Sequence, residues 1–220
     1  MAKLIFRYGA MNSGKTTVML QVAYNYEERD QKVILVKSSK DTKGDNYVVS
    51  RIGLKRKIDE FITPKDKVID KIEKYLDGLN CIIVDEAQFL LPKQVDELYY
   101  ITKLYDIPVI AYGLRSNFVM DAFDGSPRFL LLADQIEELP TICRCGKKAR
   151  QNARKIDGEF VTEGDSVAID GEYVIVNGKK KKVDYESMCG KCYLEKVLGA
   201  NKGNFKKMIY KNERWYLEHI

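Results

Sequence analysis

An eight-residue motif near the start of the chain restricts the possible folds more than any other stretch. It spans residues 9–16 and has the pattern G-x-x-x-x-G-K-T. Its residues are Gly9, Ala10, Met11, Asn12, Ser13, Gly14, Lys15 and Thr16. Residues 3–8 before it are typical of a β-strand, and residues 18–23 after it begin a helical pattern. This succession of strand, motif and helix predicts a phosphate-binding P-loop in an α/β fold.

The expected chemistry of the motif follows from its glycines and its last two residues. Glycine allows a tight turn that brings backbone N–H groups close to phosphate oxygens, and the following helix N-terminus adds a partial positive charge. We expect Lys15 to contact the terminal phosphates of the bound ligand and the Thr16 hydroxyl to bind Mg²⁺. The alternative is a chance match in a glycine-containing turn, which the flanking strand and helix disfavour.

Two adjacent acids follow a continuous apolar run at residues 81–84. An aspartate at the end of a central strand downstream of a P-loop has the Walker B position, so we expect Asp85 to hold Mg²⁺. Glu86 is then placed to accept a proton as a general base. In an ideal strand these two side chains would point to opposite faces, so both can serve one site only if the chain leaves the strand there. The alternative is a solvated pair of acids at a strand end.

Short apolar runs alternate with stretches of helical periodicity along the first 140 residues. The predicted strands are 3–8, 32–37, 81–84, 107–112 and 136–139. Helices are expected after the P-loop to about residue 29 and at 66–79 and 92–104, whereas 128–133 fits either a helix or a strand. The polar residues 38–56 predict a mobile loop. The alternation indicates an α/β fold with a doubly wound, mostly parallel sheet.

The composition changes after residue 140, where long apolar periodicity stops and glycine, lysine and aspartate become more frequent. We therefore expect a nucleotide-binding domain at 1–140, a small module at 141–200 and a basic tail at 201–220. Short runs at 166–169 and 173–176 predict strands in the small module. The tail fits either a docked strand or a partly disordered segment.

Four of the five cysteines form two close pairs, Cys143-x-Cys145 and Cys189-x-x-Cys192. In a reducing compartment two such pairs favour a structural zinc site with four thiolate ligands. Disulfides or free thiols are the alternative interpretation of the pairs. The fifth cysteine, Cys81, lies within an apolar run and is expected in the core.

Composition and the chain start narrow the class of protein. Met1-Ala2-Lys3 leads directly into a predicted strand, so we expect no signal peptide, and no apolar run is long enough to cross a membrane. These features favour a soluble cytoplasmic protein. The net charge of +5 is mild and does not by itself indicate nucleic-acid binding.

Together these motifs resemble the thymidine kinase family shared by bacteria, animal cytosol and large DNA viruses. The resemblance extends from about residue 3 to residue 193. It rests on the P-loop, on Asp85-Glu86-Ala87-Gln88-Phe89, on the Gly113-Leu114-x-x-x-Phe118 stretch and on the cysteine pairs. It implies a RecA-like P-loop domain with a zinc-held lasso, assembled as a homotetramer. It also implies transfer of the γ-phosphoryl of ATP to the 5′-hydroxyl of thymidine or deoxyuridine with Mg²⁺, and feedback inhibition by dTTP.

The resemblance assigns roles to individual positions of this sequence. Glu86 would be the general base, and Asp85 and Thr16 would serve the magnesium ion. Walls of the nucleoside pocket are matched by Met11, Phe89, Leu114, Phe118, Phe123 and Tyr185. Within the lasso, the main chain of 174–178, which includes Val174, Val176 and Gly178, would read the thymine edge.

Two other functions are compatible with parts of this pattern. A RecA- or helicase-type ATPase stimulated by nucleic acid also carries Asp-Glu-Ala-Gln after a P-loop, and the basic tail would then contact phosphates. A helicase motor normally needs two such domains, however, and this chain has room for one. A module that only binds nucleotide is the third possibility, and the intact Lys15, Thr16, Asp85 and Glu86 argue against it.

Overall fold

The structure is a computed structural model, which describes residues 1–41, 44–165, 168, 170–176, 178–211 and 214–217. The chain forms two compact units. The first unit comprises Met1–Ser116 and Ala122–Leu139, and the second comprises Asn117–Asp121 and Pro140–Ile220. Among the described residues, no helix combines the length and the apolar character needed to cross a lipid bilayer.

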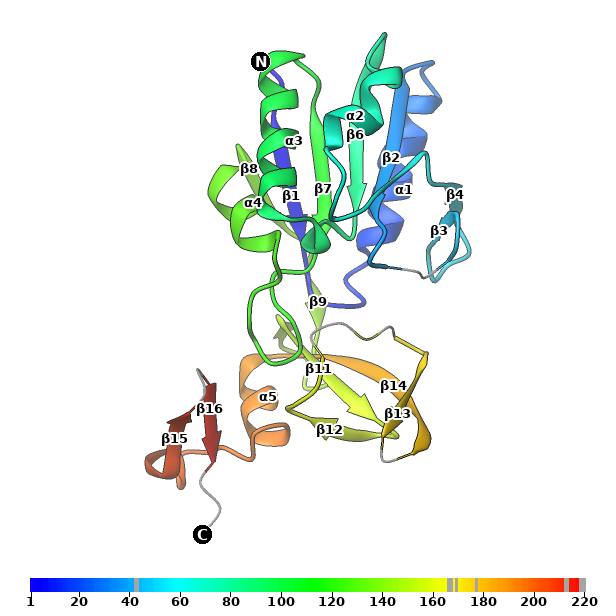
Figure 1. Cartoon of the computed structure of the whole chain (residues 1–220). Coiled ribbons are helices and arrows are strands. Elements are labelled where there is room, and N and C mark those ends of the chain that lie inside the picture. The colour runs from blue at the N-terminus through cyan, green and yellow to red at the C-terminus, as the bar shows by residue number, and fades with distance from the viewer. Residues whose placement is uncertain (42–43, 166–167, 169, 177, 212–213, 218–220) are drawn as a thin grey trace. The chain divides into compact units, whose positions relative to one another are not determined.

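The first unit is built on a six-stranded sheet whose described strands are all parallel (Figure 1). Their spatial order is β5 (Glu60–Ile62), β2 (Lys32–Ser38), β6 (Leu79–Asp85), β7 (Val109–Gly113), β1 (Leu4–Tyr8) and β8 (Gln135–Glu138). The mostly parallel α/β sheet predicted from the sequence is therefore confirmed. The edge strand β5 was not predicted, because three residues next to a polar segment give no period of their own.

Helices cover both faces of this sheet, as parallel strands require (Figure 1). They are α1 (Lys15–Glu27), α2 (Val68–Ile72), α3 (Pro92–Leu104) and α4 (Ser126–Leu132), with 3₁₀ turns η1 (Glu73–Tyr75) and η2 (Ala87–Phe89). Residues of α2, α3 and α4 form one buried cluster with the sheet, and α1 contributes to the cluster on the opposite face. The ambiguous run at 128–133 is helical, because Phe129 packs into the first cluster from α4.

Two segments of this unit differ from expectation. The predicted mobile loop at 38–56 contains an antiparallel hairpin of β3 (Tyr47–Val49) and β4 (Lys55–Lys57). Buried Val48, together with Ile58 just beyond the hairpin, packs into the cluster that contains α1, which gives this polar stretch a place to anchor. The predicted helix at 66–79 is shorter, because α2 gives way to the 3₁₀ turn η1 and then to β6.

In the described residues of the second unit, antiparallel strands are combined with the short helix α5 and the 3₁₀ turn η3 (Figure 1). Its elements are β9 (Thr141–Ile142), β10 (Lys148–Ala149), β11 (Gln151–Ile156), β12 (Glu159–Val161), β13 (Tyr173–Val176), β14 (Lys179–Met188), α5 (Gly190–Lys196), η3 (Phe205–Lys207), β15 (Met208–Lys211) and β16 (Arg214–Leu217). Strand β13 confirms the prediction at 173–176, whereas the strand predicted at 166–169 lies outside the described residues except for Ala168.

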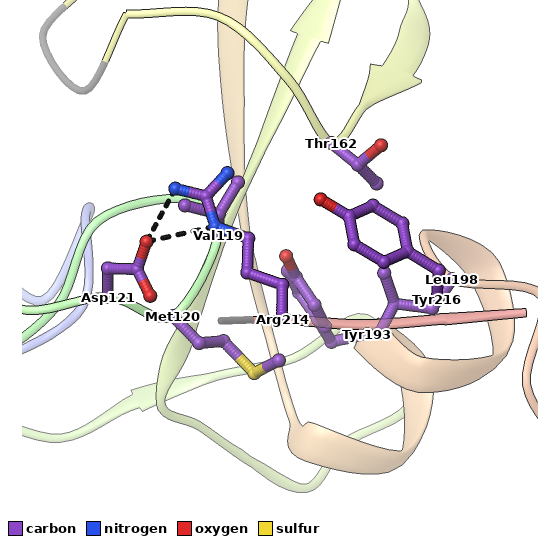
Figure 2. Close-up of a pocket in the computed structure, with 8 residues that line it drawn as sticks. All are labelled: Val119, Met120, Asp121, Thr162, Tyr193, Leu198, Arg214 and Tyr216. Carbon is purple, nitrogen blue, oxygen red and sulfur yellow. Dashed lines mark hydrogen bonds and ion pairs between the residues drawn. The ribbon is translucent and has the colours of Figure 1, made fainter. Parts of the chain in front are cut away.

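The basic tail forms the β15–β16 hairpin and packs on the segment 117–121 of its own unit. Arg214 donates two hydrogen bonds to Asp121 Oδ2, at 3.1 Å from Nε and 2.6 Å from Nη2. Figure 2 shows this ion pair beside a cavity of about 180 Å³ that Tyr193 and Tyr216 help to line. The tail residues of the hairpin therefore form part of the second unit's surface.

Candidate active site

The P-loop connects the end of β1 to the start of α1. Gly14 has the left-handed backbone angles φ 76° and ψ 13°, and Asn12 also has a positive φ of 65°. Glycine adopts this region without the strain that a Cβ causes, which explains its place directly before the helix. Lys15 Nζ donates to the carbonyl oxygens of Gly9 at 3.2 Å and Ala10 at 2.9 Å. The ammonium group therefore lies over the loop rather than in bulk solvent.

Two further features of this loop fit an anionic ligand. Ser13 Oγ is buried and, within the part of the chain that the structure describes, has no hydrogen-bond partner. A buried hydroxyl without a partner costs about 1–3 kcal/mol, which a phosphate oxygen would offset. At Gly9, an added Cβ would lie 2.5 Å from the carbonyl oxygen of Leu139, so only glycine fits this close crossing of backbones. The loop is thus shaped as a cradle with no room for a larger residue at its first position.

The two acids lie where the chain leaves the sheet. Asp85 is the last residue of β6, and Glu86 has left-handed backbone angles of φ 48° and ψ 42° before η2 begins. The strand period places Asp85 on the same sheet face as Ile83, in the cluster that contains α1. The turn at Glu86 breaks this alternation. The structure therefore meets the condition under which both carboxylates can serve one site.

Electrostatics also link the acids to the P-loop. Burial lowers the pKa of Lys15, while the nearby charges of Glu86 and Asp85 act in the opposite direction. Burial and the Glu86 charge raise the pKa of Asp85 to about 8. A buried carboxyl of this kind is costly to ionise without a cation close by. The cradle lysine and both acids thus belong to one electrostatic cluster at the carboxyl end of the sheet, where ligands of open parallel sheets bind.

A buried lysine that the sequence motifs did not reveal completes this cluster. Lys37 is 2% exposed near the end of β2, opposite Asp85 in the strand register. Its Nζ lies 3.0 Å from Asp41 Oδ2, and its charge favours the ionised form of Asp85. In the sequence, Lys37 is marked by its position directly after the apolar run of β2. A lysine is rarely buried unless it is paired.

The pocket residues suggested by the resemblance fall into both units. Phe89 and Phe123 meet in the first unit, with ring centroids 5.4 Å apart and an edge-to-face angle of 88°. Leu114 is half-buried directly after β7, and Met11 is half-buried in the P-loop. Met11 lies within the P-loop and Phe89 is three residues after Glu86, whereas Leu114 and Phe123 follow β7.

The remaining pocket residues belong to the second unit. Phe118 is 1% exposed, and the guanidinium of Arg154 lies 3.7 Å from its ring centroid. Arg154 Nε donates to the Tyr185 hydroxyl at 2.7 Å, and that hydroxyl donates to the carbonyl of Ala168 at 2.9 Å. Phe118 is therefore held as a packed side chain within its own unit. The lasso positions Val174 and Val176 are half-buried in β13, and Gly178 follows in a turn with a φ of 73°.

The four paired cysteines converge in the second unit. All four sulfur atoms lie within 4.8 Å of one another. Cys145 Sγ and Cys189 Sγ are 3.6 Å apart, close to the spacing of about 3.8 Å that tetrahedral Zn–S bonds would impose. Burial opposes ionisation of Cys143, yet hydrogen bonds from the backbone N–H groups of Cys145 and Cys189 lower its pKa to about 7. This cluster could hold a zinc ion. Cys81 is fully buried in β6, as expected of a core residue.

Comparisons with known proteins agree with this arrangement of motifs. The family model described as thymidine kinase matches residues 2–193. Proteins named thymidine kinase from Chromobacterium violaceum and Enterococcus faecalis are 42% and 49% identical over 88% and 78% of this chain, covering 98% and 89% of their own lengths. A Pif1 helicase from Candida albicans is similar at 16% identity with a TM-score of 0.39, over 63% of this chain and 36% of that one. On the family match and the two relatives named thymidine kinase, the chain belongs to the thymidine kinase family.

Proposed function

We propose that this protein is an ATP-dependent deoxynucleoside kinase that moves the γ-phosphoryl group of ATP to the 5′-hydroxyl of thymidine. Its membership of the thymidine kinase family and the curated relatives of that name support this reaction. The observation that carries the proposal is that the P-loop after β1 and the two acids at the end of β6 lie at the same edge of the parallel sheet, where the charges of Glu86 and Asp85 act on Lys15. Phosphoryl transfer needs such a site, because its catalysis is mainly positioning and charge stabilisation.

In the proposed mechanism, Lys15 and the loop backbone bind the phosphates and withdraw charge from the transferred group. Glu86 accepts the proton of the 5′-hydroxyl. At the same time, the hydroxyl oxygen bonds to the γ-phosphorus and the bond between that phosphorus and the ADP oxygen breaks. Thr16 and Asp85 offer the hard oxygen ligands that Mg²⁺ prefers, and the raised pKa of Asp85 is the property expected of a carboxyl that a cation would keep ionised. Bound there, Mg²⁺ would neutralise the phosphate charge.

The thymine base would be recognised by the apolar residues Met11, Phe89, Leu114 and Phe123, together with Phe118, Tyr185 and the main chain at Val174, Val176 and Gly178. Zinc on the four cysteines would fix the ends of the segment between Cys145 and Cys189, which contains the last four of these positions. From the family resemblance we also propose that the protein forms a homotetramer and is cytoplasmic. It would act in nucleotide salvage and be inhibited by dTTP.

An acceptor screen tests the proposed function. Purified protein is given ATP and Mg²⁺ with thymidine, deoxyuridine, the other deoxynucleosides or single-stranded DNA, and ADP formation is followed. We expect thymidine and deoxyuridine to stimulate turnover strongly and DNA to have no effect. Stimulation by DNA alone would reject the kinase and favour the nucleic-acid-dependent ATPase. In the same preparation, dTTP should raise the melting temperature, since a ligand that binds only the folded state stabilises it.

A further inference from the structure

The side chain of Gln88 links the carboxylate of Glu86 to the backbone of Leu114, the first residue after β7. It is fully buried at 0% exposure in η2. Its Nε2 donates to Glu86 Oε2 at 2.5 Å, and its Oε1 accepts from the backbone N–H of Leu114 at 3.1 Å. Both ends of the amide are therefore used. The amide therefore has one orientation. Reversing it would place its oxygen against the Glu86 carboxylate and its NH₂ group against the Leu114 N–H.

The surrounding backbone is shaped to admit this side chain. At Gly113, an added Cβ would lie 2.9 Å from Gln88 Oε1 and 3.1 Å from Gln88 N, so glycine is needed for the amide to reach the end of β7. The carbonyl of Gln88 also accepts from Gly125 N–H at 3.1 Å. Gln88 thus ties η2 to both ends of the segment that leaves β7 and returns to α4.

Leu114 is held from its other side as well. Its carbonyl oxygen accepts a hydrogen bond from Ser126 Oγ at 2.6 Å, and Ser126 is fully buried. The backbone that anchors Gln88 is therefore itself fixed. Glu86, in contrast, is half-buried and lies at a left-handed turn outside the strand, so its backbone alone does not orient its carboxylate.

We propose that Gln88 is a positioning residue that holds the Glu86 carboxylate in the orientation needed to accept the substrate proton. This inference rests on the proposed function, in which Glu86 is the general base. Gln88 would act only through Glu86, because its two side-chain hydrogen bonds join that carboxylate to the fixed backbone N–H of Leu114. A carboxylate hydrogen-bonded to a buried amide loses rotamer freedom, and misplacement of a reacting group by about 1 Å can cost roughly 10²-fold in rate.

The test compares Gln88→Met with Glu86→Gln and with the double variant, using the full chain with ATP, Mg²⁺ and thymidine. Methionine keeps the length and volume of the side chain but makes neither hydrogen bond. We expect Gln88→Met to lower kcat by about 10- to 100-fold while KM for ATP and thymidine changes less than about threefold. In the Glu86→Gln background the same change should have no further effect on kcat. A multiplicative further loss in the double variant would overturn the proposal.

A second variant and a matched control separate positioning from general destabilisation. Gln88→Glu keeps the size and the acceptor for Leu114 N–H but places a carboxylate against Glu86, so it should lower kcat as Gln88→Met does. Gln94 is also buried, at 1% exposure, and its amide bonds Leu91 N–H and the carbonyls of Thr63 and Asp66. Gln94→Met should destabilise the fold and leave kcat unchanged.

Folded Gln88 variants with the kcat of the unmodified protein would overturn the proposal, and Gln88→Glu decides if Gln88→Met does not fold. An equal loss of kcat in Gln94→Met would also overturn it, since the effect would then be structural. Failure of the proposed function is distinguishable, because the unmodified protein would then not phosphorylate thymidine at all.

Discussion

Replacement of Gly9 by alanine tests whether the P-loop depends on the close backbone crossing described above. The added Cβ would lie 2.5 Å from the carbonyl oxygen of Leu139, and Ser13 Oγ obstructs it as well. Carbon and oxygen atoms in proteins rarely approach closer than about 3 Å, so the loop or the chain at Leu139 must move by roughly 0.5 Å. The Leu139 oxygen belongs to backbone that follows an ordered strand and has little freedom to move.

The expected loss of stability in Gly9→Ala follows from this overlap. Overpacking of a well-ordered site costs typically about 1–3 kcal/mol, which for a chain of this size lowers the melting temperature by about 2–12 °C. The larger effect should be on nucleotide affinity, because the displaced loop carries the N–H groups expected to bind phosphate. We predict at least about a tenfold weaker affinity for ATP.

Calorimetric titration with ATP and thermal unfolding measure both effects. Gly78→Ala is the control, since Gly78 has a positive φ of 67° but nothing within 4 Å of an added Cβ. It should cost about 1 kcal/mol of stability and leave ATP affinity unchanged. Unchanged stability and ATP affinity in Gly9→Ala would refute the reasoning about the crossing.

Three further predictions concern the general base, the cysteine cluster and the packing of the second unit. Glu86→Gln should bind ATP normally in calorimetry but lose roughly 10²–10⁴-fold in thymidine phosphorylation, and undiminished turnover would remove Glu86 from the mechanism. Purified protein should contain about one zinc per chain by elemental analysis, and a strong chelator should lower the melting temperature; zinc-free protein with four titratable thiols would contradict the site. Phe118→Ala should destabilise the second unit by about 3–5 kcal/mol in urea unfolding, because Phe118 is buried beneath Arg154. Phe205→Ala is its control, since Phe205 is 69% exposed, and similar losses in both variants would contradict the packing argument.

The sequence predicted most of the first unit because its signals are local. The P-loop, the strand that ends at Asp85 and the helix at 92–104 each carry a period or motif that does not depend on distant residues. The β3–β4 hairpin and β5 could not be predicted in this way. Their pairing depends on partners elsewhere in the unit, such as the α1 cluster that buries Val48.

The candidate site was predictable as a set of residue types but not as a geometry. The sequence placed Asp85 and Glu86 together, whereas the left-handed turn that redirects Glu86 appears only in the structure. Lys37 carried no motif, and its role beside Asp85 depends on the pairing of β2 with β6. The association of residues 117–121 with the second unit is likewise a tertiary effect, since the hydrogen bond from the Tyr193 hydroxyl to the Phe118 carbonyl at 2.5 Å joins residues 75 positions apart.

The most direct test of the account follows the γ-phosphoryl group itself. ATP labelled at the γ-phosphorus is incubated with the protein, Mg²⁺ and thymidine, and the labelled products are separated. We expect the label to move to the 5′-position of thymidine in step with ADP formation, and this transfer to be nearly absent in Glu86→Gln. Labelled inorganic phosphate as the only product, formed whether or not thymidine is present, would contradict it.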